Sequence, residues 1–480
     1  MPKAGQLAIN VLKKKGKNKE KKFMNLGEKN NPVIELQKAE VKLQNGEIIF
    51  LDIPKTVYPP REDSALLIDY LETLKPNGVA MEIGCGSGIL SILLAKNNWK
   101  VEACDINPYA VAAAKKNSAS ASVQHNIIFR EGGLGEEKFS IPEGTKLLFW
   151  NLPYLNPPLP NEPRLDWIEE ASMSDLEKKG WGHQLADYLE VNRRYLEPDL
   201  LVVLLQRKYP KSPSNTKYWL NQGWSHRVIK SIWIHDEKLE LVGYWKPGQG
   251  IPMKIIQECI STMDEAKKLP NFGWQRIRTN KQIRGRGRRE STWVSNEQDL
   301  LATWNIKKSI LGNINPGILQ IVIGTKISDL LEQYCKWPND ILDNSGSKIG
   351  GILIEMDNQE EHLRIGIGIN YLAKQIGSME VIGWDEKTPG ITTNNISQMI
   401  DAILSTLFEE HELLTHNLSP DILKRDSWRG LSKLLSRGYS LKIKDKKSRI
   451  IGLDGNGGLS TLIEGKKSLN QSIDELTWLF

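Results

Sequence analysis

A glycine-rich turn preceded by an acid constrains most strongly how this chain can fold. It reads Glu-Ile-Gly-Cys-Gly-Ser-Gly over residues 82–88, between a strand-like run at residues 79–83 and a helical pattern at residues 89–97. Glycines let the backbone turn sharply and approach a ligand closely. Asp105 ends the next strand-like run, about 20 residues on, where a carboxylate can accept hydrogen bonds from ribose hydroxyls. Strand, glycine turn, helix, strand predicts an α/β domain with a doubly wound parallel sheet.

Composition limits the classes of protein to consider. The chain has 480 residues, 40% hydrophobic and 25% charged, which predicts a globular protein. Its longest apolar runs fall far short of the ~20 residues that cross a bilayer, and no signal peptide is recognisable. The four cysteines form no Cys-x-x-Cys pair and predict neither a zinc site nor a disulfide framework. We expect a cytoplasmic protein with no metal site of its own and no membrane contact.

The chain divides into four predicted parts. Residues 1–28 carry a lysine-rich block that predicts a solvated, flexible tail, with contact to RNA as the alternative. A first α/β domain is expected over residues 29–246, and the stretch 246–252, dense in proline and glycine, predicts a linker. A second α/β domain is expected over residues 253–431. Strand-like runs around a glycine-rich turn predict a small β-barrel over residues 432–480.

The spacing of the glycines indicates which ligand the turn suits. Gly84, Gly86 and Gly88 form a G-x-G-x-G pattern after Glu82, whereas nicotinamide-binding turns use G-x-G-x-x-G. The helix that begins there offers free N–H groups. S-adenosylmethionine has a ribose for Asp105 but no pyrophosphate to seat, so it is the predicted ligand, with a nicotinamide cofactor as the alternative.

A polar loop follows the strand predicted at residues 146–150. It reads Asn151-Leu-Pro-Tyr154, and Val-Tyr-Pro-Pro-Arg-Glu-Asp lies upstream at residues 57–63. In this order the motifs resemble the HemK family of glutamine N5-methyltransferases, of the archaeal and eukaryotic type that lacks a helical N-terminal domain. The resemblance implies a class I methyltransferase fold.

The same resemblance implies roles for individual residues. The Asn151 side chain and a backbone carbonyl would accept hydrogen bonds from the target NH2 group, and the Tyr154 ring would stack on the planar amide. The nitrogen lone pair would then point at the methyl group. The implied acceptor is the glutamine of a Gly-Gly-Gln loop in a peptide-chain release factor. The residues implied to hold S-adenosylmethionine are Asp63, Glu82, Gly84, Gly86, Gly88, Asp105 and Asn151.

Two departures from this family leave an alternative open. Leu152 stands where the family has a second proline. Glu131 stands near the position where the family places an acid against the adenine, and it is the candidate substitute. The alternative is a degenerate methyltransferase domain that only binds a protein or RNA partner. Residues 151–158 could also be an ordinary proline-rich loop.

Four separated blocks mark the second α/β domain. They are Ser-Thr-Met-Asp-Glu-Ala from 261, Gln-Ile-Arg-Gly-Arg-Gly-Arg-Arg from 282, Lys-Trp-Pro-Asn-Asp from 336, and Lys-Ile-Gly-Gly-Ile-Leu from 348. Gly-Ile-Gly-Ile-Asn, from 366, lies on the strand after the fourth block. Joining a carboxylate to the α-phosphate of ATP gathers negative charge, which requires fixed cations and N–H donors. A glycine-spaced arginine loop and a lysine supply them. Taken singly, the blocks have ordinary alternatives: a helix N-cap, an RGG-like nucleic-acid contact, or a turn.

Together and in this order, the blocks resemble the biotin protein ligase family. The resemblance implies an α/β catalytic domain with a small SH3-like barrel. It also implies an enzyme that forms biotinyl-5′-AMP from biotin and ATP with Mg²⁺, then transfers biotin to a lysine of a biotin carboxyl carrier protein. The implied catalytic residues are Lys348, Arg286, Arg288 and, as a base for the acceptor lysine, Asp340. The implied biotin- or ATP-binding residues are Ser261, Thr262, Gln282, Gly285, Arg286, Gly287, Arg288, Arg289, Lys348, Gly351, Gly368 and Asn370.

This resemblance also has departures. Met263 replaces the asparagine usual after Ser-Thr, and Glu290-Ser291 replaces the Gly-Arg usual after the arginine loop. No winged-helix pattern precedes the ligase blocks, so neither a repressor role nor sequence-specific DNA binding is expected. A general nucleic-acid-binding protein that uses the tail and the arginine loop is the remaining alternative.

Overall fold

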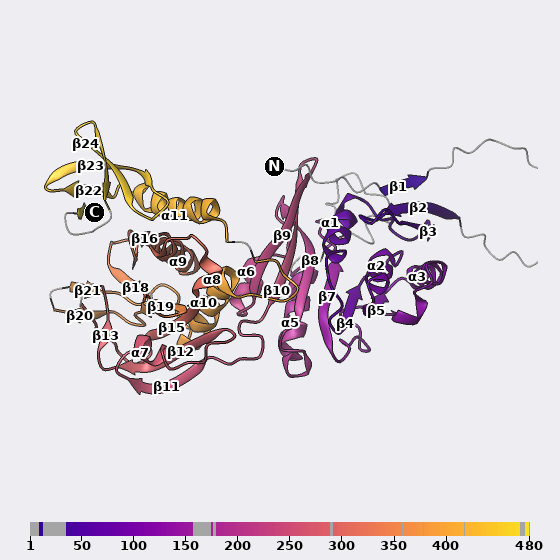
Figure 1. The fold of residues 1–480 in the computed structure, drawn as a ribbon, viewed down its shortest axis with the longest axis horizontal. Coiled ribbons are helices and arrows are strands. Elements are labelled where there is room, and N and C mark those ends of the chain that lie inside the picture. The colour runs from indigo at the N-terminus through magenta and orange to yellow at the C-terminus, as the bar shows by residue number, and fades with distance from the viewer. Residues whose placement is uncertain are drawn as a thin grey trace, which may run out of the picture. The chain divides into compact units, whose positions relative to one another are not determined.

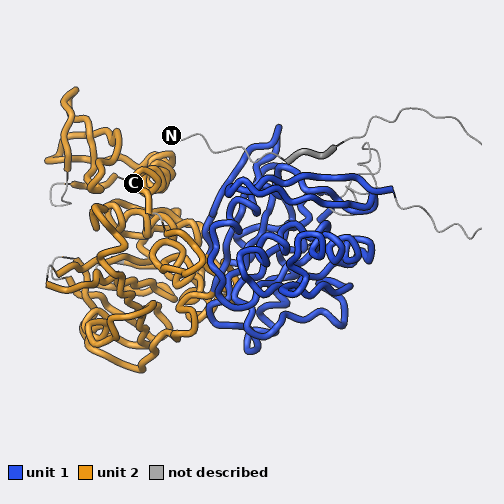
Figure 2. Tube along the Cα trace, turned by 45° about the vertical axis from the view of Figure 1, so that its right-hand side comes forward, with its two compact units in different colours: residues 1–219, 226–245 blue, residues 220–225, 246–480 orange. Residues whose placement is uncertain are grey.

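A computed structural model describes residues 9–12, 35–156, 174–175, 179–288, 291–357, 359–377, 379–416, 418–470 and 476–479. The chain forms two compact units (Figure 2). Met1–Trp219 and His226–Trp245 make the first, and Leu220–Ser225 and Lys246–Phe480 make the second. Most of the predicted tail, residues 1–28, lies outside the described residues.

The first unit is built on a seven-stranded sheet in the order β6-β5-β4-β7-β8-β10-β9 (Figure 1). The strands from β6 to β8 run parallel, and β10 pairs antiparallel with β8. The chain order reverses between β4 and β7, and the carboxyl ends of strands at such a point form the crevice where open parallel sheets bind ligands. A second, antiparallel sheet joins β1, β2 and β3. The strands are β1 (Ile9–Leu12), β2 (Leu36–Lys42), β3 (Ile48–Pro54), β4 (Val79–Ile83), β5 (Lys100–Asp105), β6 (Ile127–Glu131), β7 (Thr145–Asn151), β8 (Leu201–Tyr209), β9 (Ser225–Ile234) and β10 (Glu237–Trp245).

Local signals in the sequence place the helices of this half of the chain. Asn107 caps α3, because its side chain accepts a hydrogen bond from Tyr109 N at 3.0 Å, and Pro108 takes the first helical position. The strands and helices predicted on both sides of the glycine turn are confirmed, with ends moved by no more than three residues. The helices are α1 (Glu62–Leu71), α2 (Ile89–Lys96), α3 (Pro108–Ser120), η1 (Gln124–Asn126), α5 (Trp181–Val191), η2 (Arg193–Tyr195) and α6 (Thr216–Asn221).

The second unit has a mixed sheet whose main path is β11-β12-β15-β19-β18-β17-β16. β11 runs parallel to β12, and the other neighbours on the path are antiparallel. Helices α9 and α10 share one apolar core with the central strands, in which Trp304 and Phe408 are fully buried. The strands are β11 (Lys254–Cys259), β12 (Gln275–Gln282), β13 (Gly285–Arg286), β14 (Thr292–Trp293), β15 (Leu300–Lys307), β16 (Tyr334–Lys336), β17 (Asp340–Leu342), β18 (Lys348–Met356), β19 (His362–Ile369), β20 (Lys374–Ile376) and β21 (Met379–Val381). The helices are α7 (Thr262–Ala266), α8 (Lys308–Leu311), α9 (Pro316–Leu330), α10 (Thr393–Phe408) and α11 (Pro420–Leu435).

A five-stranded sheet in the order β25-β24-β23-β22-β26 ends the chain. Its buried Leu441 and Leu459 share a core with Trp337, whose indole N–H donates to Gly457 O at 2.8 Å. The strand runs predicted here are confirmed, whereas closure into an SH3-like barrel stays a prediction. The strands are β22 (Ser440–Ile443), β23 (Lys446–Leu453), β24 (Leu459–Ile463), β25 (Lys466–Asn470) and β26 (Leu476–Leu479).

The stretch predicted as a linker is bound into the second unit. Arg276 donates to Ile251 O at 2.7 Å and to Pro247 O at 3.1 Å, and Glu409 accepts from Gly248 N at 2.9 Å. Asp401 accepts from Arg276 Nε at 2.9 Å and holds the guanidinium in turn. Proline and glycine here mark a fixed turn, because charged side chains distant in sequence bind its backbone.

The described residues contain no group of three or more His, Cys, Asp or Glu side chains arranged to hold a metal ion. The four cysteines are buried and form no disulfide. Among the helices of the described ranges, none is long and apolar enough to cross a membrane.

Candidate functional site

The glycine turn joins β4 to α2 at the carboxyl edge of the first sheet. Gly84, Gly86 and Gly88 have φ values of 70°, 50° and 81°, the left-handed region that favours glycine. A Cβ at Gly88 would lie 2.8 Å from Ala114 Cβ, so packing requires glycine there. A Cβ at Gly86 would meet nothing nearer than a backbone oxygen 4.0 Å away. The backbone at Gly86 is therefore open to a ligand.

Asp105 lies beside this turn, as predicted from its spacing. Its carboxylate accepts hydrogen bonds from Gly86 N at 2.8 Å and from Asn107 N at 2.9 Å. Burial raises its pKa, against these two hydrogen bonds. Glu131 ends β6, is exposed, and lies opposite Asp105 in the β5–β6 register. The fold thus brings the two candidate nucleoside-binding carboxylates to one edge of the sheet.

Glu82 points into the fold rather than out of it. It is buried at the end of β4, and its carboxyl accepts a hydrogen bond from the Ser91 hydroxyl of α2. Burial raises the pKa of Glu82 to about 8, with Ser91 opposing the shift and the charge of Asp105 adding to it. The carboxyl therefore keeps its proton at neutral pH and holds α2 against the strand beneath the turn.

The predicted acceptor loop brings three side chains together. Asn151 Nδ2 donates to Asp63 Oδ2 at 2.9 Å, and Asn151 Oδ1 is buried with no hydrogen-bond partner. Asp63 and Tyr154 are also buried, and burial raises the pKa of each. An unsatisfied buried acceptor costs about 1–3 kcal/mol, so this amide oxygen is prepared for an N–H donor from a ligand.

Sequence reasoning missed the residue that holds the far end of this loop. Arg207 on β8 is buried, and it donates to Glu237 Oε1 at 2.7 Å and to Asn156 Oδ1 at 3.1 Å. The available signal was a charge at the end of a long apolar strand, because such a charge is buried only when it is paired.

The ligase-like blocks converge on one cavity of about 270 Å³ in the second unit. Gly285 lies next to it, since a Cβ there would come 3.1 Å from Gln282 Nε2. Asn370 follows β19 outside the lining, and its Oδ1 is buried without a partner. Arg289 and Glu290 lie outside the described residues. The predicted residues that line the cavity are Ser261, Thr262, Gln282, Arg286, Gly287, Arg288, Asp340, Lys348, Gly351 and Gly368.

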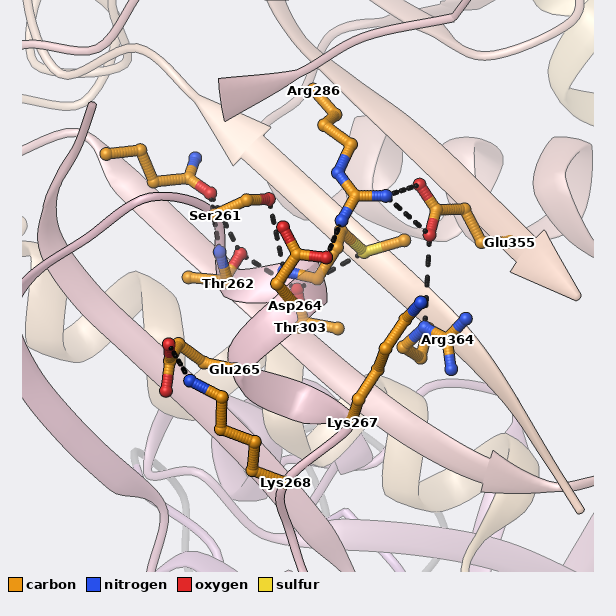
Figure 3. Close-up of polar contacts among 12 residues, drawn as sticks. Ser261, Thr262, Asp264, Glu265, Lys267, Lys268, Arg286, Thr303, Glu355 and Arg364 are labelled. Atoms are coloured by element: carbon orange, nitrogen blue, oxygen red, sulfur yellow. Dashed lines mark hydrogen bonds and ion pairs between the residues drawn. The ribbon is translucent and has the colours of Figure 1, made fainter. Parts of the chain in front are cut away.

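The end of the cavity at Ser261, Thr262 and Gln282 is lined by uncharged polar groups. The charged side chains of Asp264 and Arg286 lie beside Ser261 and Thr262 (Figure 3). Ser261 caps α7 through its hydroxyl, which accepts from Met263 N at 3.3 Å. Thr262 donates to Gln282 Oε1 from its N–H at 2.8 Å and from its hydroxyl at 3.2 Å. The Thr303 hydroxyl donates to Thr262 Oγ1 at 2.9 Å. Short neutral groups held by one another suit a ligand with both N–H and C=O groups.

The other end carries cations. Lys348 begins β18, and its ammonium lies 2.7 Å from Asp340 Oδ1 and 5.7 Å from the centre of the Trp293 ring. Lys336 reaches the same aspartate at 3.6 Å. Arg288 donates to Asn339 Oδ1 at 3.5 Å. Two lysines share one carboxylate here, so positive charge is in excess at this end.

Arg286 is paired with two carboxylates of the protein itself. Its guanidinium pairs with Asp264 of α7 and with Glu355 of β18, whose carboxylate oxygens lie 3.0 and 3.3 Å from Nη1 (Figure 3). Partial burial disfavours its charge, but these two carboxylates raise the pKa of Arg286 overall. Two protein anions thus already neutralise this guanidinium, which is among the predicted catalytic and biotin- or ATP-binding residues.

Two large side chains of the cavity were not among the predicted site residues. A Cβ at Gly368 would lie 2.7 Å from the Trp293 ring, and a Cβ at Gly366 would lie 2.7 Å from Met263 Sδ. The glycines of β19 thus make room for Trp293 and Met263. Met263 stands in the block quoted from 261, and Trp293 follows the arginine block, but only the three-dimensional register shows that glycines face them.

Two family models match the chain. The methyltransferase small domain matches residues 61–140, and the biotin/lipoate A/B protein ligase family matches residues 273–370. A putative protein N5-glutamine methyltransferase of Methanocaldococcus jannaschii is 40% identical over 202 residues, which cover 42% of this chain and 97% of that protein.

The ligase half has relatives of its own. The bifunctional ligase/repressor BirA of Bacillus spizizenii is 36% identical over 180 residues, which cover 29% of this chain and 55% of that protein. The biotin protein ligase from Aquifex aeolicus, solved in complex with biotin and ATP, is 20% identical with a TM-score of 0.35, and the match covers 47% of this chain and 98% of that one. The chain therefore belongs, through its N-terminal half, to the protein N5-glutamine methyltransferase family, and its C-terminal half carries a domain that matches the biotin/lipoate A/B protein ligase family.

Proposed function

We propose that the second unit is a biotin protein ligase that forms biotinyl-5′-AMP from biotin and ATP and transfers biotin to a lysine of a biotin carboxyl carrier protein. The cavity with two unlike ends carries this proposal. Thr262 and Gln282 provide the uncharged groups that a ureido ring needs. Lys348 and Arg288 provide cations for phosphate oxygens. The apolar Trp293 and Met263 line the space between and suit the hydrocarbon part of biotin.

The two half-reactions use the charged end differently. In the first, a biotin carboxylate oxygen attacks the α-phosphorus of ATP and pyrophosphate leaves, while Lys348 neutralises the charge that gathers on the phosphate. Mg²⁺ bound with ATP would share that charge. In the second, the acceptor amine attacks the acyl carbon and AMP leaves. We assign Asp340, whose carboxylate lies 2.7 Å from the Lys348 ammonium, as the group that accepts the amine proton.

Streptavidin blotting of a carrier domain, incubated with the full chain, biotin and ATP, tests the ligase proposal. We expect labelling with the wild-type protein and none with Lys348→Ala. Lys326→Ala is the matched control, because Lys326 pairs with Asp426 and does not line the cavity. No labelling by the wild type would reject the ligase function, and labelling that persists in Lys348→Ala would reject the role of this lysine.

For the first unit we propose methyl transfer from S-adenosylmethionine to the side-chain amide of a glutamine, with a peptide-chain release factor as the acceptor protein. The unpartnered Oδ1 of Asn151, beside the buried Tyr154, carries this proposal. Asp105 suits the ribose, and the open backbone at Gly86 suits close approach of the ligand. S-adenosylmethionine supplies the methyl group. Asn151 accepts from the target NH2 group and holds its lone pair toward that methyl.

Transfer of labelled methyl to a release factor, together with calorimetry of S-adenosylmethionine binding, tests this second activity. We expect binding and methylation by the wild type, and lost methylation on a release factor whose Gly-Gly-Gln glutamine is changed to alanine. Binding without methylation would support the alternative of a domain that only binds. Absence of binding would reject the S-adenosylmethionine site.

We also propose that the C-terminal sheet closes as an SH3-like barrel and forms a separate domain over residues 432–480. Its five short strands and its buried Leu441 and Leu459 support this. The activities proposed for both units use small molecules of the cytoplasm, so we place the protein there.

A further inference from the structure

Six side chains of alternating charge form a series of ion pairs, here called the circuit, beside the ligase cavity. Asp264 pairs with Arg286, and Arg286 pairs with Glu355. Arg364 Nε lies 3.9 Å from Glu355 Oε2, and Arg364 also pairs with Glu360. Glu360 Oε1 lies 3.9 Å from Lys267 Nζ, which returns the circuit to α7. Three anions and three cations balance, and Arg286 is the member that lines the cavity.

The circuit connects the elements that shape the biotin end of the cavity. Asp264 lies in α7, Lys267 is its C-cap, Glu355 lies on β18 and Arg364 on β19. Helix α7 has only five residues, too few to be stable without outside support. Yet this helix places Ser261 and Thr262 at the cavity. Its position therefore depends on contacts such as these.

Charge balance separates Arg286 from the cations at the other end of the cavity. Arg286 has two carboxylates of its own before any ligand arrives, whereas Lys348 and Lys336 share Asp340. Arg364, with only 5% of its side chain exposed, needs Glu355 and Glu360 to offset its buried charge. An anionic ligand thus meets excess positive charge at Lys348 and none at Arg286.

We propose that Asp264 and Glu355 are positioning residues for biotin. Through its ion pairs with both, Arg286 links α7 to β18 and does not serve as a phosphate ligand. This rests on the proposed ligase function. The two carboxylates act through Arg286 on the start of α7, where Thr262 meets Gln282. Their effect falls on biotin binding and leaves the steps at the phosphate unchanged.

Asp264→Asn and Glu355→Gln in the full chain test this, with KM for biotin and for ATP measured separately and the biotin Kd measured by calorimetry. A partly exposed ion pair contributes up to roughly 1 kcal/mol, so we expect Asp264→Asn, which loses one pair, to raise the biotin KM and Kd about three- to fivefold. Glu355→Gln loses its pairs with Arg286 and Arg364 and should raise them up to about tenfold. The KM for ATP, and kcat at saturating biotin, should stay within about twofold. Asp264→Glu keeps the carboxylate and should restore wild-type values.

Glu265→Gln is the matched control. Glu265 lies on the same helix but pairs with Lys268, outside the circuit (Figure 3). Unchanged biotin affinity in both test variants would overturn the proposal. A lower KM for ATP in either variant would also overturn it, because the acids would then be restraining a phosphate-binding arginine. A wild-type protein that binds no biotin would instead reject the ligase function itself.

Discussion

The two candidate sites handle charge in opposite ways. In the first unit, the carboxyl groups of Asp63 and Glu82 are only 2% exposed, and burial raises the pKa of both. In the second unit, the side chains of Arg286 and Lys348 are 35% and 29% exposed and lie in ion pairs with carboxylates. One site tunes protonation by burial, and the other balances charge by pairing. This difference implies that a change of pH should affect the site of the first unit most. The loss of a single charged side chain should affect the site of the second unit most.

Removal of the lysine at the cationic end is the strongest test of this contrast. Lys348→Ala takes away positive charge where the phosphate charge gathers, and we expect biotinyl-AMP formation to fall about 10³-fold. Biotin-dependent exchange of pyrophosphate into ATP measures this step alone. A loss below about tenfold would place the main electrostatic contribution elsewhere.

In the candidate site of the first unit, the largest effect on methyl transfer should follow the loss of a hydrogen-bond acceptor rather than the loss of a charge. Asn151→Ala removes the unpartnered amide oxygen, and we expect methyl transfer to fall about 10²-fold. Single-turnover transfer of labelled methyl groups at saturating S-adenosylmethionine is the measurement. Asn156→Ala, at the far end of the same loop, should have a smaller effect because that side chain contacts Arg207 instead.

A substitution at Asp105 tests whether its carboxylate and the glycine turn together bind S-adenosylmethionine. Asp105→Ala removes the acceptor for Gly86 N and the predicted ribose contact, so we expect S-adenosylmethionine affinity to drop roughly tenfold. Calorimetric titration measures the change. Asp52→Ala, a surface residue paired with Lys116 in the same unit, serves as control. Equal affinities for all three proteins would remove Asp105 from the site.

The smallest effect concerns pH and Glu82. The pKa of this carboxyl is 4.5 in the unfolded chain and about 8 when folded, so between these values the folded state keeps a proton that the unfolded state loses. Stability of the first unit must then fall as pH rises from 4.5 to 8, and Glu82→Gln removes this loss. We expect the Tm of the variant to gain about 5 °C on the wild type between pH 5 and pH 8.5.

Thermal unfolding at several pH values measures this gain. Glu47→Gln, an acid in the same unit that pairs with Lys96, provides the comparison. A Tm difference that does not change with pH would mean that Glu82 loses its proton in the folded protein.

Local patterns were enough to predict the glycine turn, its flanking elements and most of the ligase cavity. Residues close together in the sequence specify both the apolar strands and the glycines with positive φ. The ligase blocks were recognisable as a set. The pairing of Arg286 with Glu355 depends on which side chains the β18 register brings to the loop, across 69 residues. Arg207 and the bound linker were missed for the same reason, since their partners lie far away in the sequence.

The segment Leu220–Ser225 belongs to the second unit although the chain on both sides of it belongs to the first. Its Ser225 hydroxyl donates to Ser405 Oγ at 2.6 Å, and its Gln222 carbonyl accepts from Lys246 at 2.8 Å. A gene fission at any single codon therefore cannot yield two complete proteins. A cut near codon 246 would leave these six residues on the N-terminal product and take the Ser225 partner of Ser405 away from the second unit.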